Sequence, residues 1–309
     1  MLPPAALSTP SEVTPGPWVG PLRPSLAGCV RRVLLLPSRI FAHRDFVVTC
    51  VGRDLRARFR GSTLGFLWPL LQPLCIFAVY GFLFAELLGL RMPGTAASGT
   101  AYGVYLFTGA LVWSSIAEAI TRATTCVKES RNLVQKLSFP CELLPLNPVL
   151  SSAVTLGFGV AAYVLLTLVT GIWTAPGVDL LWIPALLAAQ LAFTYGVAMF
   201  VAAANVIARD TEHAVAVLLT LAMFATPVFW VPSIEALPAL ERWMPLVDAN
   251  PLHHLLQAWR GVLMGGEPAA CFTSTPAEAL SRFVPWSVFA FLLGSSVFAL
   301  AERRFPDEV

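Results

Sequence analysis

The sequence contains few charged residues. They make up 12% of its 309 residues, whereas hydrophobic residues make up 57% and the mean hydropathy is +0.72. A soluble domain has about 25% charged residues, so this composition excludes an ordinary soluble fold. The long apolar runs suffice for about six helices of roughly 20 residues each. We therefore predict an all-α integral membrane protein with six transmembrane helices.

Sequence motifs for catalysis are also lacking. The chain has no GxxxxGK[ST] phosphate loop, no HExxH, no GxSxG and no carboxylate pair at a useful spacing. His253 and His254 are adjacent, and neighbours on a helix point about 100° apart, which favours a packed or surface role over a metal site. We expect no catalytic residue, no metal and no cofactor bound by this chain. Nothing in the sequence points to nucleic acid.

Six cysteines occur without CxxC spacing. In the topology below Cys271 alone faces the outside, which leaves no pair there to form a disulfide, so free thiols are expected. Residues 1–37 are rich in Pro and lack the continuous apolar region of a signal peptide. We predict that they form a disordered cytoplasmic tail. Proton-coupled carriers need carboxylates near mid-membrane, but the acids of the first two spans, Glu86 and Glu118, lie near span ends and are interpreted as interfacial.

Lys and Arg are distributed asymmetrically about the predicted spans. Nine arginines precede the first span, and two Arg and two Lys lie between the second and third. With Arg209, Arg303 and Arg304, one side holds sixteen of the twenty basic residues. The positive-inside rule then places both termini in the cytoplasm. The predicted spans are residues 64–90, 101–120, 146–172, 180–208, 214–231 and 283–301, within a domain of residues 63–304 that is followed by a tail of residues 305–309.

Residues 38–62 form a basic amphipathic segment that continues directly into the first span. Apolar residues recur on one side at helical spacing, and arginines lie opposite. This pattern suits a helix in the headgroup layer with its guanidiniums toward phosphates. An ordinary positive cluster that only sets topology is an equally good interpretation of the spacing. The arginines of this segment are Arg39, Arg44, Arg53, Arg56, Arg58 and Arg60.

Two further segments do not fit a full span. Residues 128–140 are too polar to cross a bilayer, and we predict that they form a short cytoplasmic helix that ends at Phe139 and Pro140. Residues 234–264 contain short helical pieces, one beginning at Asn250 and Pro251. Because their leucines need burial, we predict a re-entrant helical hairpin that dips into the membrane from outside.

Aromatic residues are plentiful around the first and fifth spans. Trp at span ends usually belongs to an interfacial belt, and lipid-facing packing is the favoured interpretation. Aromatic faces can also stack on sugars, so a translocation path is the alternative. The candidates for that path are Trp68, Phe77, Tyr80, Phe84, Phe224, Phe229 and Trp230.

Several motifs occur in one order between residues 38 and 304. They include RDLRARFRGSTLGFLWP at 53–69, GALVW at 109–113, NLVQKLSFP at 132–140, Asn250–Pro251 and Arg260–Gly261. In this the chain resembles the permease subunits of type-2 ABC exporters for polysaccharides, O-antigen and teichoic acids. Such permeases often have Lys-Lys or Lys-Val before the Phe-Pro, where this chain has Gln135, Lys136 and Leu137.

The resemblance implies a homodimer in the bacterial cytoplasmic membrane, paired with two copies of a separate ATPase that binds Mg-ATP. The cargo would be a lipid-linked glycan, with lipids or small drugs as the alternative. Arg53, Arg56, Arg58 and Arg60 would lie near the lipid diphosphate at a lateral gate, and a hairpin containing Asn250 and Arg260 would cap the exit. The implied ATPase-coupling residues are Glu129, Asn132, Leu133, Val134, Gln135, Lys136 and Phe139. A third hypothesis is a non-transport membrane scaffold or a glycan-processing enzyme. The lack of catalytic motifs argues against it.

Overall fold

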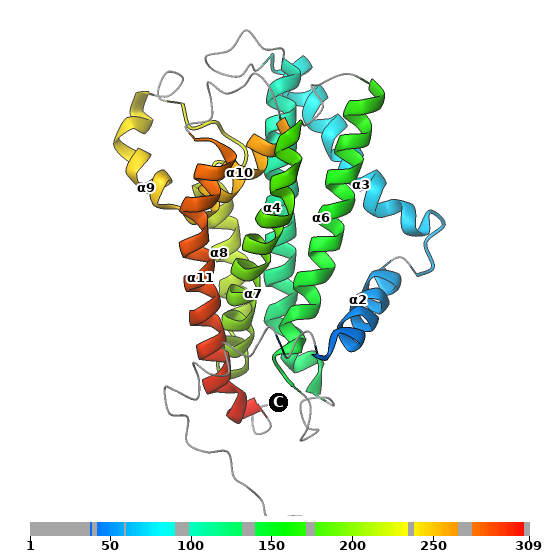
Figure 1. Ribbon diagram of the computed structural model, residues 1–309, viewed down its shortest axis with the longest axis vertical. Coiled ribbons are helices and arrows are strands. Elements are labelled where there is room, and N and C mark those ends of the chain that lie inside the picture. Colours follow the sequence, from blue (N-terminus) through cyan, green and yellow to red (C-terminus); the bar gives the residue numbers. More distant parts are fainter. Residues whose placement is uncertain are drawn as a thin grey trace, which may run out of the picture.

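The computed structural model describes residues 38, 42–58, 60–89, 99–131, 140–170, 177–233, 238–264 and 274–305. Within these ranges all regular structure is helical (Figure 1). In this part of the chain, four candidate membrane spans are long and apolar enough to cross a bilayer, which confirms the prediction of an all-α membrane protein. They are covered by α4 (Gly99–Glu129), α6 (Leu143–Thr170), α7 (Ile183–Ile207, preceded by η3, Val178–Trp182) and α11 (Pro276–Ala301).

The other two predicted spans are occupied by shorter apolar helices, over Leu71–Phe84 and Thr211–Ala225. The first begins in α3 (Trp68–Tyr80), which contains Pro73, and continues into the π-helical η2 (Gly81–Leu87). Proline inside a membrane helix favours a kink or distorted turn, and the change to π-helix begins about two turns beyond Pro73. The remaining elements are α2 (Arg44–Arg58), η1 (Gly65–Leu67), α8 (Thr211–Ala225), η4 (Pro238–Trp243), α9 (Met244–Ala249), α10 (Pro251–Met264) and η6 (Glu302–Arg304).

Local sequence signals explain several helix boundaries. At the start of α11, the Thr275 hydroxyl accepts from the Glu278 amide and the Glu278 carboxylate accepts from the Thr275 amide, which makes a capping box. The predicted start of α10 is confirmed, because Asn250 Oδ1 accepts from the Leu252 amide at 3.0 Å and Pro251 is the first helical residue.

The four long helices pack around two apolar clusters. α4 contributes to both, with Tyr105 and Ile116 in one and Ala123 and Val127 in the other. α7 and α11 approach closely at Gly196 and Gly294, because a Cβ on either glycine would overlap the backbone of the other helix. Small residues allow membrane helices this close contact.

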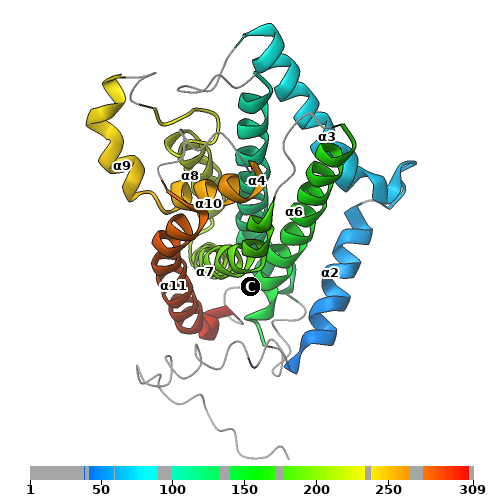
Figure 2. The same ribbon diagram turned by 45° about the horizontal axis from the view of Figure 1, so that its top comes forward.

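Three shorter helices lie toward opposite ends of the bundle. Both views show α9 and α10 in the upper half and α2 at the lower side, where it packs against α6 (Figures 1 and 2). α4 runs between these two regions and packs against α6, α7 and α10. It continues to Glu129, beyond the predicted span end at residue 120. Predicted features at residues 1–37, 132–139 and 234–237 lie outside the described residues.

Candidate functional site

The basic segment forms α2, and two of its charged residues pair with α4. Arg58 Nη1 lies 2.5 Å from Glu118 Oε1, and Arg122 Nη2 donates to Asp54 Oδ1, also at 2.5 Å. Arg58 Nε is 3.5 Å from Asp54 Oδ2, and Arg122 Nη1 is 3.7 Å from Glu118 Oε1. These four residues, two from each helix, are referred to below as the four-charge cluster. Its charges cancel.

The four-charge cluster is partly shielded from solvent, with exposed side-chain fractions between 18% and 33%. Burial acts to raise the pKa of Asp54, but the hydrogen bond from Arg122 and the charges of Arg122 and Arg58 outweigh it. The pKa of Asp54 is therefore below its ordinary value. Partly buried pairs are screened less than surface pairs, so the cluster can hold α2 against α4.

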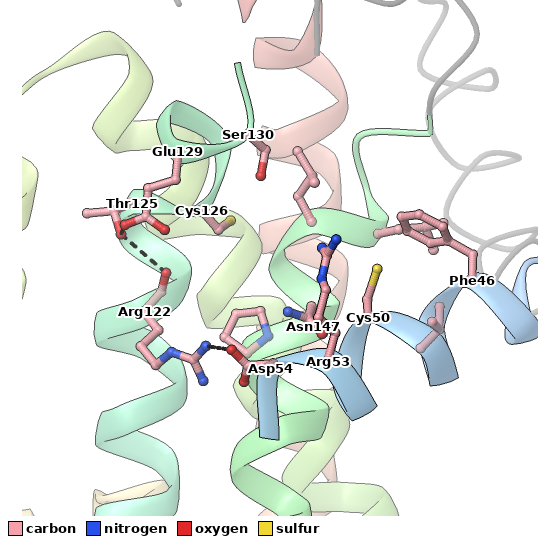
Figure 3. A pocket seen from close by; sticks show the side chains of 14 residues that line it. Phe46, Cys50, Arg53, Asp54, Arg122, Thr125, Cys126, Glu129, Ser130 and Asn147 are labelled. Carbon is pink, nitrogen blue, oxygen red and sulfur yellow. Dashed lines mark hydrogen bonds and ion pairs between the residues drawn. The ribbon is translucent and has the colours of Figure 1, made fainter. Parts of the chain in front are cut away.

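A pocket of about 230 Å³ lies beside the cluster, between α2, the end of α4 and the start of α6 (Figure 3). Arg53 and Asp54 line it from α2, Glu129 and Ser130 from the end of α4, and Asn147 from α6. The side chain of Asn147 keeps an oxygen that is buried and, among the described residues, accepts no hydrogen bond. The wall of the pocket is therefore mixed, with a guanidinium and an amide among apolar side chains.

The four arginines suggested for the lipid diphosphate are not equivalent. Arg53, Arg56 and Arg60 are exposed, whereas Arg58 belongs to the four-charge cluster. Arg56 Nε donates to the carbonyl of Gly52, four residues earlier on the same helix, at 2.9 Å. The structure thus separates three exposed arginines, of which Arg53 also lines the pocket, from one that faces the bundle. The amphipathic pattern did not reveal this difference.

Among the predicted coupling residues, the described one is Glu129. It is exposed at the end of α4, where its carboxylate accepts from the Thr125 hydroxyl at 2.7 Å. The neighbouring Lys128 turns inward and donates to Asn205 Oδ1 on α7 at 3.2 Å. The other six predicted residues, at positions 132–136 and 139, are outside the described part of the chain.

The predicted hairpin residues, Asn250 and Arg260, lie toward the other end of the bundle. Asn250 Nδ2 donates to Thr226 Oγ1 at 2.8 Å. Arg260 is 1% exposed, and its guanidinium carbon lies 3.5 Å from the ring centre of Tyr105. Tyr105 was not singled out from the sequence, where nothing marks it apart from other aromatic residues.

The candidate path aromatics fall into three groups. Tyr80 contacts the rings of Phe84 and Phe229, each at 6.0 Å between centres. Phe77 instead packs edge-on against Phe107 at 5.2 Å, on the apolar core. The others lie apart from these contacts. Phe224 is 64% exposed on α8, Trp68 is 40% exposed and donates to Ser62, and Trp230 donates to the Phe224 carbonyl.

Cysteine and histidine take structural positions. Cys50, Cys75, Cys126 and Cys141 are free thiols, as expected from the sequence. His253 and His254 are buried, and His254 Nε2 lies 2.7 Å from the Asp248 carbonyl oxygen. Within the described ranges, no cluster of three or more His, Cys, Asp or Glu side chains could hold a metal ion.

The fold and these sites define a helical membrane protein with a charged peripheral helix ion-paired to one end of its bundle and short helices packed at the other. Residues 46–264 match the family described as ABC-2 type transporter, and the chain belongs to that family. Membership makes it the membrane part of an ABC transporter, which works with an ATPase.

Curated relatives are similar over most of the chain. The O-antigen export system permease protein RfbA of Myxococcus xanthus is 27% identical over 278 residues, which cover 90% of this chain and 100% of that protein. A protein of the same name from Klebsiella pneumoniae is 25% identical over 264 residues, covering 85% of this chain and 94% of the relative. A second from that organism is 25% identical over 223 residues.

Proposed function

We propose that this chain is the permease subunit of an ATP-driven exporter that moves a lipid-linked O-antigen polysaccharide across the bacterial cytoplasmic membrane. The observation that carries the proposal is the match to an O-antigen export permease over that protein's entire length. Because one scaffold can carry different cargoes, family membership alone does not fix the substrate. The relatives favour polysaccharide over the alternative cargoes, lipids and small drugs.

The working unit is a homodimer with two ATPase subunits, and each copy crosses the membrane six times. In addition to the four long spans, α3 with η2 forms the first crossing and α8 the fifth. The asymmetry of Lys and Arg supports cytoplasmic termini. In this orientation α2 and the end of α4 face the cytoplasm, and α10 faces outward.

The lipid-linked substrate enters beside α2. Arg53, Arg56 and Arg60 bind the diphosphate and headgroup phosphates, because guanidinium groups pair with phosphate oxygens in a bidentate manner. Their exposure supports this role. Arg58 has a different role, since its ion pair with Glu118 holds α2 against α4.

ATPase movement reaches the permease through residues 128–140, a segment that begins in the last turn of α4. Glu129 is exposed at the end of this helix and is available to the partner. A helix fixed at the inner end of a span converts closure of the ATPase into movement of that span. At the outer side, Tyr80, Phe84 and Phe229 form the part of the candidate path whose rings touch one another.

Affinity purification of the tagged chain from its native membrane tests this assembly. We expect an ATPase with a phosphate loop to co-purify in equal copy number, in complexes that contain two permease chains. Monomeric permease without an ATPase, under conditions that keep the membrane fraction intact, would contradict the proposal.

A further inference from the structure

Arg260 on α10 is a buried cation that joins three parts of the fold. Its guanidinium donates to the carbonyl of Tyr105 on α4 at 3.3 Å. It also donates to the carbonyls of Pro227 and Val228, which follow α8, at 2.8 Å and 3.0 Å. One side chain therefore links α10, α4 and the segment after α8.

The surroundings of Arg260 suit arginine for geometric reasons. No carboxylate of the described residues lies within ion-pairing distance of it, so carbonyl dipoles and the face of Tyr105 balance the charge. The planar guanidinium can donate in several directions while it stacks on a ring, whereas a lysine ammonium is a compact charge without a flat face. A buried charge that loses its partners is strongly destabilising.

Gly109 provides the space that Arg260 occupies. A Cβ added to Gly109 would overlap Arg260 Nη2 and lie 2.9 Å from the Val228 carbonyl oxygen. Gly157 on α6 offers a contrast, because nothing lies within 4 Å of a Cβ built there. The glycine at 109 is thus required by a contact made 151 positions later in the chain.

Two additional hydrogen bonds fix the same segment. Tyr105 Oη donates to the Trp230 carbonyl at 3.1 Å, and Asn250 Nδ2 donates to Thr226 Oγ1 at 2.8 Å. The chain between Thr226 and Trp230 is therefore bound to α4 on one side and to the start of α10 on the other. Arg260 lies among these contacts.

We propose that Arg260 is a positioning residue for export, which fixes the outer hairpin and the segment after α8 to α4. The inference rests on the proposed function, in which α10 faces outward, and on the exit role that the family resemblance implies for this hairpin. α4 has 31 residues and is roughly 46 Å long, so it connects the coupling segment with this contact. The hairpin then moves together with α4 when the ATPase acts.

The test uses the full transporter in its native cell, with R260Q, R260K, G109A and, as matched control, G157A. Complex assembly, ATP hydrolysis and polysaccharide at the cell surface are measured for each. We expect R260Q and G109A to assemble and to hydrolyse ATP like wild type while surface polysaccharide falls about tenfold. R260K should restore part of the loss, because it keeps the charge but not the planar donor geometry. G157A should behave like wild type.

Wild-type export by both R260Q and G109A would overturn the proposal. If R260Q fails to assemble, G109A and R260K decide the outcome, since both retain a cation at position 260. If these two variants also fail to assemble, Arg260 is required for folding, and the positioning role is overturned. Failure of the proposed function is distinguishable, because cells that lack the chain would then still carry normal surface polysaccharide.

Discussion

Arg58 of α2 and Glu118 of α4 form an ion pair, with Nη1 and Oε1 2.5 Å apart. This contact turns one arginine of the basic helix toward the bundle while Arg53, Arg56 and Arg60 remain exposed. One arginine of α2 therefore attaches the helix to the bundle, and the three others are available to the headgroup layer. Glu118, interpreted from the sequence as an interfacial acid, is the anchor for that attachment.

The energetic coupling of Arg58 and Glu118 can be measured with a double-mutant cycle of R58Q and E118Q. Each single change removes the nearer of the other residue's two charged partners, so we expect each to lower the thermal stability of the purified complex. The loss of stability in the double variant should be smaller than the sum of the two single losses by about 1 kcal/mol. R56Q is the matched control on the same helix and should have little effect. Strict additivity of R58Q and E118Q would contradict the pairing.

The pH dependence of the four-charge cluster follows from Asp54. Its pKa is lower in the folded protein than in the unfolded chain, so its stabilising effect is complete above the ordinary value of 3.8 and is lost as the pH falls through the lowered pKa. The difference in thermal stability between wild type and D54N should therefore stay constant from about pH 8 to about pH 5. A difference that disappears within that range would mean that the pKa of Asp54 is raised.

The exposed arginines are expected to act on substrate rather than on assembly. In the variant R53Q/R56Q/R60Q, complex levels and stability should match wild type, while surface polysaccharide falls by about tenfold or more because three phosphate contacts are lost. Measuring complex levels and surface polysaccharide in the same cells separates an effect on export from an effect on assembly. Unchanged export together with poor assembly would instead assign these arginines to structure.

The segment after α4 is expected to couple ATP hydrolysis to export. Replacing Leu133 and Phe139 with Asp should leave ATP hydrolysis running while polysaccharide export stops, because the apolar contacts to the ATPase are lost. The ratio of ATP hydrolysed to polymer exported is the measurement. E129Q, which alters an exposed residue at the end of α4, serves as a milder comparison. A wild-type ratio in the double variant would refute the assignment.

The sequence predicted the helical membrane fold and the basic helix because composition and periodicity are local signals. It placed the end of the fifth span too late, since α8 stops at Ala225. The signal was present: Thr226 precedes Pro227 and is extended, as the residue before a proline prefers. The predicted second span ends at residue 120 because the residues after it are too polar to cross a bilayer, and α4 continues through them as one helix to Glu129.

The long-range contacts could not be predicted in this way. Arg58 and Glu118 are 60 positions apart, and Gly109 and Arg260 are 151 apart, so no local pattern joins them. Gly109 was noted as part of a family motif, but its physical role appears only when Arg260 is seen to occupy the space beside it. Pairing across distant helices depends on packing, which a single sequence does not display.

The central claim is tested most directly by removing this chain from its native cell and following the lipid-linked polysaccharide. We predict that the polymer accumulates on the cytoplasmic side, that none reaches the surface, and that the chain restores export only together with its ATPase. Normal surface polysaccharide in cells that lack the chain would contradict the account.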